Sequence, residues 1–155
     1  MLKWAGAAGI CVNDEGRVLM VLQGKPEEVK KWSVPSGGLE EGESFRECCR
    51  REFMEETGFI IEVFDEVRVK TGTYEGFKVE VHYYIVKIVG GSRKIQDPDN
   101  LIYDIAWKSK EEIAILDLSF PEDRDFLLSF LEKRQLFTLK GKQLLNAKIF
   151  APFLL

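Results

Sequence analysis

Histidine and cysteine are scarce in this 155-residue chain. His82 is the only histidine, and the three cysteines, Cys11, Cys48 and Cys49, include no Cys-x-x-Cys pair. Zinc sites need several such ligands at short spacings, so the composition argues against zinc. An odd cysteine count with two adjacent cysteines is also a poor basis for disulfides. We therefore expect a reducing compartment, the cytoplasm.

Long hydrophobic runs are missing as well. No apolar segment reaches the roughly 18 residues that a membrane span requires, so we expect no membrane partner. The small apolar residues near the start lead into Asn13-Asp14-Glu15-Gly16. That sequence is typical of a hairpin turn and not of a signal-peptide cleavage site.

Basic residues are not in excess either. The chain has 22 lysines and arginines against 26 aspartates and glutamates, a net charge of −4. This balance argues against nucleic acid as the partner. A net negative protein that handles phosphates needs a metal ion or local cations to offset the repulsion. With 45% hydrophobic and 31% charged residues, the composition is that of a globular domain.

Patterns of β-branched and aromatic residues predict strands along most of the chain. The expected strands are residues 3–13 paired with 17–23 as a hairpin, 59–71 paired with 77–89, and 101–107. Trp32–Pro35 is expected to be a short extended piece that leads into a glycine loop at Ser36-Gly37-Gly38. One helix is expected to start after Ser44 and a second near Pro121, because Ser44-x-x-Glu47 and Ser119-x-x-Glu122 are capping patterns. Gly58 is placed to end the first helix.

Three glutamates of the first helix are expected to share one face. At 100° per residue, Glu52, Glu55 and Glu56 fall within an arc of about 100°. Like charges this close oppose each other's ionisation unless a positive group lies among them. Clustered carboxylate oxygens suit a hard divalent cation such as Mg²⁺ or Mn²⁺. A solvated acidic helix face is the alternative explanation.

The residues around these glutamates resemble the box of the Nudix hydrolase family, whose members include MutT. The matching positions are Gly37, Glu43, Arg51, Glu52, Phe53, Glu55, Glu56, Gly58 and Phe59. The resemblance implies an α/β protein, the Nudix α/β/α sandwich with a mixed sheet. It extends over residues 1–134 as one Nudix domain, and residues 135–155 lie outside it.

The resemblance also implies roles for individual residues. Glu52, Glu55 and Glu56, with the backbone carbonyl of Ser36, are the expected metal ligands. Glu55, Glu56, Arg51 and Glu43 are the expected catalytic residues, with Arg51 and Glu43 in orienting roles. The implied reaction is attack of a metal-activated water on a phosphorus of a nucleoside diphosphate linked to another group.

The general base and the substrate contacts are left open by the residues. The base is expected to be a box glutamate or a later acid, with Glu75, Asp97, Asp99 and Asp104 as candidates. Tyr74 and Asp99 are the candidate substrate-binding residues. Aromatic side chains that could stack on a base are Trp4, Trp32, Tyr74, Phe77, Tyr83 and Trp107. His82 is expected to be an ordinary strand residue.

Several functions are compatible with the pattern. The expected substrate is a nucleoside triphosphate or a dinucleoside polyphosphate. A pyrophosphohydrolase acting on RNA 5′ ends is an alternative, with Lys25, Lys30 and Lys31 as its basic loop. A non-catalytic nucleotide sensor is another, although the intact box argues against it.

The last 21 residues are rich in apolar side chains and lack any acid. Residues 135–155 include Phe137, Leu139, Leu144, Leu145, Ile149, Phe150, Phe153, Leu154 and Leu155. An exposed apolar stretch of this length is a liability, so it is expected to pack on the domain or on a partner, for example in a homodimer.

Overall fold

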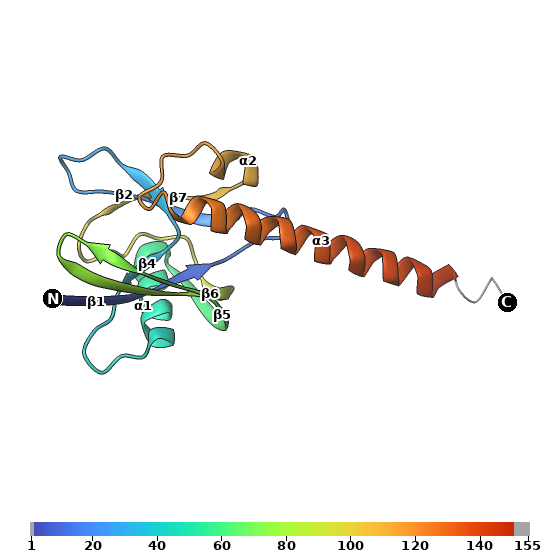
Figure 1. Cartoon of the computed structure of the whole chain (residues 1–155), viewed down its shortest axis with the longest axis horizontal. Helices are drawn as coiled ribbons and strands as arrows, with labels where there is room; N and C mark the ends of the chain where they lie inside the picture. Colours follow the sequence, from blue (N-terminus) through green and yellow to red (C-terminus); the bar gives the residue numbers. More distant parts are fainter. Residues whose placement is uncertain (1, 151–155) are drawn as a thin grey trace.

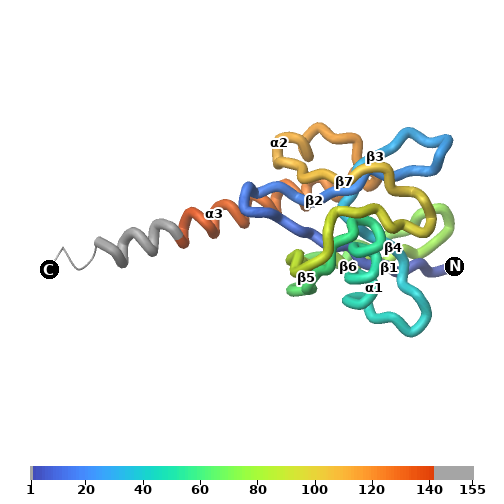
Figure 2. Tube along the Cα trace, turned by 180° about the vertical axis from the view of Figure 1, so that it is seen from behind, coloured from blue at the N-terminus to red at the C-terminus, as the bar shows by residue number. Residues whose placement is uncertain are grey.

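The computed structural model describes the backbone of residues 2–150 and the side chains of residues 2–141. Its strands are β1 (Leu2–Ile10), β2 (Val18–Gln23), β3 (Lys31–Ser33), β4 (Ser36–Gly38), β5 (Phe59–Tyr74), β6 (Phe77–Gly91) and β7 (Ile102–Lys108). Its helices are α1 (Phe45–Thr57), α2 (Lys110–Ile113) and α3 (Asp123–Phe150). Figure 1 shows the elements coloured along the sequence, and Figure 2 also labels β3.

The strands form two sheets. One has the order β4-β1-β6-β5 and is mixed, because β1 and β6 are parallel while the other neighbours are antiparallel. The other is antiparallel, with the order β3-β2-β7. Helix α1 packs on strands of the mixed sheet, and α2 contacts α3. The predicted α/β fold with a mixed sheet is therefore confirmed.

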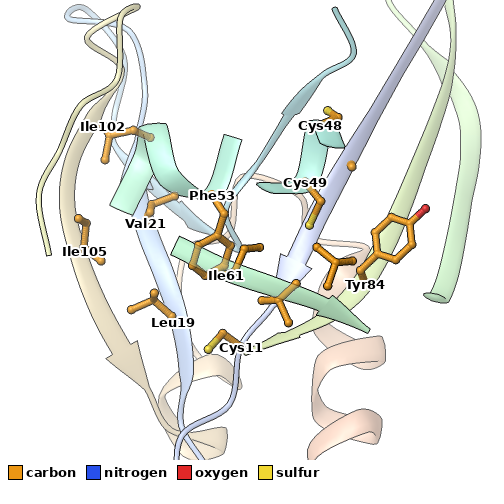
Figure 3. Packing of buried hydrophobic residues seen from close by; sticks show 13 residues of the cluster. Cys11, Leu19, Val21, Cys48, Cys49, Phe53, Ile61, Tyr84, Ile102 and Ile105 are labelled. Atoms are coloured by element: carbon orange, nitrogen blue, oxygen red, sulfur yellow. The ribbon is translucent and has the colours of Figure 1, made fainter. Parts of the chain in front are cut away.

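Alternate residues of the strands face two separate apolar clusters. On β2, Leu19 and Val21 belong to the cluster that contains Phe53 of α1, whereas Val18 and Met20 belong to the cluster that contains Leu127 of α3. Figure 3 shows Phe53 at the centre of the first cluster. Because a strand alternates its side chains, a continuous apolar run such as β2 is buried on both faces. Complete burial of Phe53 contributes about 2–3 kcal/mol.

The predicted hairpin of residues 3–13 and 17–23 is wrong beyond its turn. Asn13 accepts backbone hydrogen bonds from Glu15 and Arg17, and Gly16 has a φ of 76°. A bridge then joins Val12 to Val18, after which the strands separate. Strand β1 pairs with β4 and β6, whereas β2 pairs with β3 and β7. Local residues specify the turn, but long-range packing on both faces decides the partners of each strand.

Other expected elements are confirmed with small changes. The side chain of Ser44 accepts the backbone N–H of Glu47 at the start of α1, and Gly58 ends the helix with a φ of 81°. Strands β5 and β6 pair across a two-residue turn at Glu75 and Gly76. The expected glycine loop at 36–38 is instead the edge strand β4. Helix α2 was not expected, although Ser109 and Glu112 form a full capping box there.

Helix α3 extends far beyond the sheets (Figures 1 and 2). Leu131 is buried, whereas Leu136, Phe137 and Leu139 are exposed. These three side chains are therefore largely exposed on α3, and packing of the extension on the domain or on a partner stays a prediction. Residues 151–155 lie outside the described residues. Among residues 2–150, no helix combines the length and apolarity that crossing a membrane requires.

Candidate active site

Helix α1 carries the acidic residues on the side that meets β4. The same helix is anchored by Cys48, Cys49 and Phe53, which are almost completely buried, and Cys48 Sγ donates to the carbonyl of Gly37 on β4. Because residues three and four apart lie on the same helix face, this anchoring fixes the direction of the acidic face. The site is thus positioned by the core contacts of the same helix.

Arg51 binds several carboxylates of the site. Its Nε and Nη2 donate to the two oxygens of Glu43 at 2.7 and 2.8 Å. Its Nη1 donates to Glu52 at 2.8 Å and to Glu55 at 3.3 Å. Nη2 also donates to the carbonyl of Gly38 on β4 at 2.8 Å. The hydrogen bonds from Arg51 lower the pKa of Glu43, because they favour its charged form.

Gly37 leaves room for the carboxylate of Glu52. A Cβ atom at position 37 would lie 2.1 Å from Cδ of Glu52, far inside van der Waals contact. A side chain at position 37 would displace this carboxylate, so glycine allows Glu52 to lie against β4. Burial raises the pKa of Glu52, and the charges of Glu55 and Asp97 act in the same direction.

Glu56 is a buried carboxylate whose loss of hydration is offset only by weak hydrogen bonding. Only 4% of the residue is exposed, and the backbone N–H of Ser36 lies 3.3 Å from both of its carboxylate oxygens. Burial raises the pKa of Glu56 well above its usual range, and the charges of Glu52, Asp97 and Glu55 add to the effect. A cation placed at Glu56 would favour the ionised form.

The backbone of Ser36 faces this carboxylate. Ser36 is opposite Ala8 in the ladder of β1 with β4, and the flanking pair Gly9 and Pro35 is hydrogen-bonded. Hydrogen-bonded and non-hydrogen-bonded pairs alternate in an antiparallel ladder. Both backbone groups of Ser36 are therefore directed away from β1, where its N–H meets Glu56.

The loop between β6 and β7 brings a further acid to the site. Its Gln96 N–H donates to the carbonyl of Glu55 at 2.9 Å, which ties the loop to the end of α1. The negative charge of Asp97 raises the pKa of both Glu52 and Glu56. Asp99 is exposed in the same loop, and its N–H donates to Asp97.

The carboxylates are arranged around Arg51 and not around a common centre. Among residues 2–141, no three histidine, cysteine, aspartate or glutamate side chains lie grouped closely enough to hold a metal ion as they stand. The guanidinium of Arg51 contacts Glu43, Glu52 and Glu55. A metal ion would have to compete with Arg51 for Glu52 and Glu55.

An apolar cleft of about 520 Å³ adjoins this site at Ser36. Four of the aromatic residues expected to be near substrate line it: Trp4, Tyr74, Phe77 and Tyr83. The cleft lies between the paired ends of β5 and β6 and the segment that leads into α3. It is a concave, mostly apolar cavity of the kind that binds small molecules.

Other residues considered from the sequence lie elsewhere. Glu75 is in the turn between β5 and β6, and Asp104 pairs with Arg93 at 2.7 Å. Trp32 lies under the ammonium of Lys108, and Trp107 packs against the cluster of α1. His82 stacks on Phe45 with ring centroids 3.7 Å apart.

Sequence reasoning missed part of the cleft. Phe120, Lys70 and Asp123 line it, and Asp123 is buried. Asp123 and Glu122 follow the helix-starting pattern at Pro121, so their acidity was indistinguishable from ordinary first-turn acids. Only the folded chain brings them beside Lys70.

Comparison with known proteins assigns the family. The chain matches the sequence profile of the NUDIX domain over residues 3–130, so it belongs to the NUDIX family and is a Nudix hydrolase. Nucleoside triphosphatase NudI of Enterobacter sp. (strain 638) is 33% identical over 100 residues, which are 57% of this chain and 69% of that protein. The NudI of Salmonella newport (strain SL254) is 34% identical over 99 residues, with the same shares covered.

Solved structures share the fold. A NUDIX hydrolase from Nitrosomonas europaea has a TM-score of 0.71 and 23% identity, covering 84% of this chain and 86% of that one. A MutT protein from Methanosarcina mazei Go1 has a TM-score of 0.71 and 20% identity, covering 86% of this chain and 96% of that one.

Proposed function

We propose that this protein hydrolyses a phosphoanhydride bond of a nucleoside triphosphate, with Mg²⁺ or Mn²⁺ bound at α1. The observation that carries the proposal is the junction at Ser36 between the acidic face of α1 and the aromatic cleft. A phosphate chain at the carboxylates would place an attached nucleoside in the cleft. The names of the NudI relatives support a triphosphate over other nucleoside diphosphate compounds. A dinucleoside polyphosphate would need a second base site as well.

The residues present fit a hard divalent cation. Carboxylate and carbonyl oxygens are its preferred ligands, and Glu56 is a buried carboxylate that lacks a positive partner among the described residues. We assign Glu52, Glu55, Glu56 and the carbonyl of Ser36 as the groups that would hold the metal. When bound, it would supply Lewis-acid charge for the phosphate oxygens and lower the pKa of a water molecule.

The remaining residues position these groups. Gly37 allows Glu52 to lie against β4, and Arg51 with Glu43 orients the end of α1 that faces β4. Hydrolysis breaks one P–O bond, and the water oxygen becomes a phosphate oxygen. Glu55, which is more exposed than Glu56, is placed to accept the proton of that water, with Asp97 as the second candidate.

The loop of Lys25, Lys30 and Lys31 gives little support to an RNA substrate. The ammonium of Lys30 donates to the carbonyls of Pro26 and Glu28 and lies 4.7 Å from the ring centre of Tyr103. Lys30 is therefore engaged by groups of its own loop and of Tyr103, which leaves it less able to contact a phosphate backbone.

The proposal is tested by turnover on a nucleotide panel. Phosphate and pyrophosphate release would be measured with Mg²⁺, with Mn²⁺ and with a chelator, for nucleoside triphosphates, dinucleoside polyphosphates, ADP-ribose and 5′-triphosphate RNA. We expect metal-dependent turnover that is fastest with a nucleoside triphosphate. Preference for another class would overturn the substrate, and binding without any turnover would favour the sensor.

A matched pair of variants tests the site. Glu55→Gln should lower kcat at least about a hundredfold, because a metal ligand and proton acceptor is lost. Glu47→Gln makes the same change on an exposed position of α1 and should leave kcat within about twofold. Equal activity of the two variants would contradict the assignment.

A further inference from the structure

A second groove, of about 790 Å³, lies where α3 passes the turn between β1 and β2 (Figures 1 and 2). It is lined there by Ile10, Val12 and Ile85, at the point where the pairing of β1 with β6 ends. The groove shares no lining residue with the aromatic cleft and includes no residue of α1. It is therefore separate from the proposed catalytic site.

Helix α3 forms one wall of the groove, with two aromatic residues between two cations. Phe130 and Phe137 are seven residues apart, so they point in directions only about 20° apart. Lys133 lies about 60° to one side of Phe130, and Arg134 lies about 40° to the other side. All four residues line the groove. This face of α3 is thus apolar along its middle and positively charged along both edges.

Strands β5 and β6 contribute the same combination of groups. Phe64 of β5, which is 42% exposed, and Lys87 of β6 line the groove. Among residues 2–141, no carboxylate lies within ion-pair distance of Lys87, Lys133 or Arg134. Asp14 is the only acid among the described residues that line the groove. Three positive charges therefore meet one negative charge here, although the chain as a whole has a net charge of −4.

We propose that this groove binds a small amphiphilic anion, a molecule with an apolar chain or ring and one carboxylate or sulfonate group. The apolar lining would bury the chain or ring, and the cations at the edges would contact the anionic group. A concave, mostly apolar site with a few charged groups is the usual form of a small-molecule site. The three cations without a carboxylate partner supply those groups.

A second copy of the chain is a poorer occupant of the groove. Residues 135–155 carry three lysines and no acid, so the extension of another copy would bring like charge to Lys87, Lys133 and Arg134. Leu136 and Leu139 point about 100° and 160° away from Phe137 on α3. A contact between copies through these two leucines would leave the groove open.

Decanoate is the probe, because it joins an aliphatic chain to a single carboxylate. Calorimetry below the micelle concentration should show one molecule bound per chain with a Kd below about 1 mM. Butyrate has the same anionic group on a shorter chain and should bind at least about tenfold more weakly. Decyltrimethylammonium has a similar chain and the opposite charge, and it should also bind at least about tenfold more weakly. Trp107 lines the groove, so its fluorescence should change on binding, and Trp107→Phe should remove that change.

Variants assign the binding to the groove. Lys133→Gln combined with Arg134→Gln should raise the Kd for decanoate at least about fivefold without changing the melting temperature, because both positions are exposed. Lys25→Gln combined with Lys31→Gln makes the same change of net charge at exposed positions outside the groove and should leave the Kd within about twofold. Phe64→Ala should also raise the Kd at least about fivefold, because part of the apolar lining is lost.

The outcomes distinguish this proposal from the proposed function. Glu55→Gln should bind decanoate as tightly as wild type, because Glu55 does not line the groove. No binding of decanoate, or equal binding of decyltrimethylammonium, would overturn the proposal. An unchanged Kd in the double variant at Lys133 and Arg134 would also overturn it. If a second copy fills the groove, decanoate would not bind and Phe64→Ala would convert a dimer into a monomer, which would overturn it as well.

Discussion

Arg51 holds together carboxylates that would otherwise repel one another. It lies between Glu43, Glu52 and Glu55 at distances from 2.7 to 3.3 Å. The side chain of Glu43 is only 11% exposed, so its charge depends on this partner. The arginine of the sequence pattern is therefore also a structural requirement.

Replacing Arg51 by Met should destabilise the protein. The substitution leaves partly buried carboxylates without their cation, and we expect the free energy of unfolding to fall by about 2–4 kcal/mol. Urea denaturation without metal measures this loss. Arg50→Met, at the exposed neighbouring position, should change it by less than about 0.5 kcal/mol. Equal effects of the two substitutions would show that Arg51 does not hold the site together.

Replacing Gly37 by Ala tests the contact between β4 and α1. The added Cβ would displace the carboxylate of Glu52, so kcat/KM should fall about a hundredfold. Gly141→Ala adds a Cβ to α3 where no atom lies within 4 Å and should leave kcat/KM unchanged. A fully active Gly37→Ala variant with an intact fold would show that the position of Glu52 is not critical.

Helix α1 carries a pH dependence that follows from its buried acids. The pKa values of Glu52 and Glu56 are raised, chiefly by burial, so the folded state retains their protons at a higher pH than the unfolded state. Stability of the metal-free protein should therefore fall as pH rises above about 4.5 and through the raised pKa values. Mg²⁺ should restore stability at neutral pH, because it favours the ionised carboxylates.

Glu56→Gln should weaken both effects. In chemical denaturation between about pH 5 and pH 8 with a chelator, the variant should lose less stability than wild type. Mg²⁺ should raise its melting temperature less than that of wild type. Glu47→Gln should behave as wild type in both measurements. A variant with the pH dependence of wild type would show that Glu56 is not the source.

At the scale of elements, the sequence pattern was sufficient to predict those helices and strands that depend on contacts between residues close together in the chain. Ser44 and Gly58 predicted the ends of α1, and the apolar runs predicted β5 and β6. The pairing of β1 was not predictable from its turn, because β6 lies more than 60 residues away along the chain. The three-residue strand β4 was not predicted either, because it also pairs with a distant segment, β1. In addition, its two glycines are typical of a loop.

In the candidate site, too, features set by local sequence could be predicted, whereas features set by long-range contacts could not. The acidic face of α1 could be predicted because its glutamates belong to a single helix, and the 100° rotation per residue alone places them on one face. The cleft could not, because Trp4, Tyr74 and Phe120 come from three distant segments. The charge of Asp97 beside Glu56 likewise depends on a loop that returns to α1.

For the whole molecule, the extended α3 predicts self-association. Leu136, Phe137 and Leu139 are exposed on α3 beyond Leu131, the last buried residue among those whose side chains the structure describes, and the sequence after Gln143 is rich in apolar residues. Such a surface is stabilised by burial against a second copy. Sedimentation velocity should show a dimer for wild type and a monomer when these three residues are replaced by glutamate. A monomeric wild-type protein would contradict the prediction that α3 mediates self-association.

The most direct test of the account is Mn²⁺ binding followed by electron paramagnetic resonance. The central claim is that the acidic face of α1 holds a divalent metal, although Arg51 occupies part of it in this structure. Wild-type protein should remove the signal of free Mn²⁺ at near-stoichiometric concentrations, and Glu56→Gln should bind at least about tenfold more weakly. Equal binding by both proteins would place the metal elsewhere and contradict the claim.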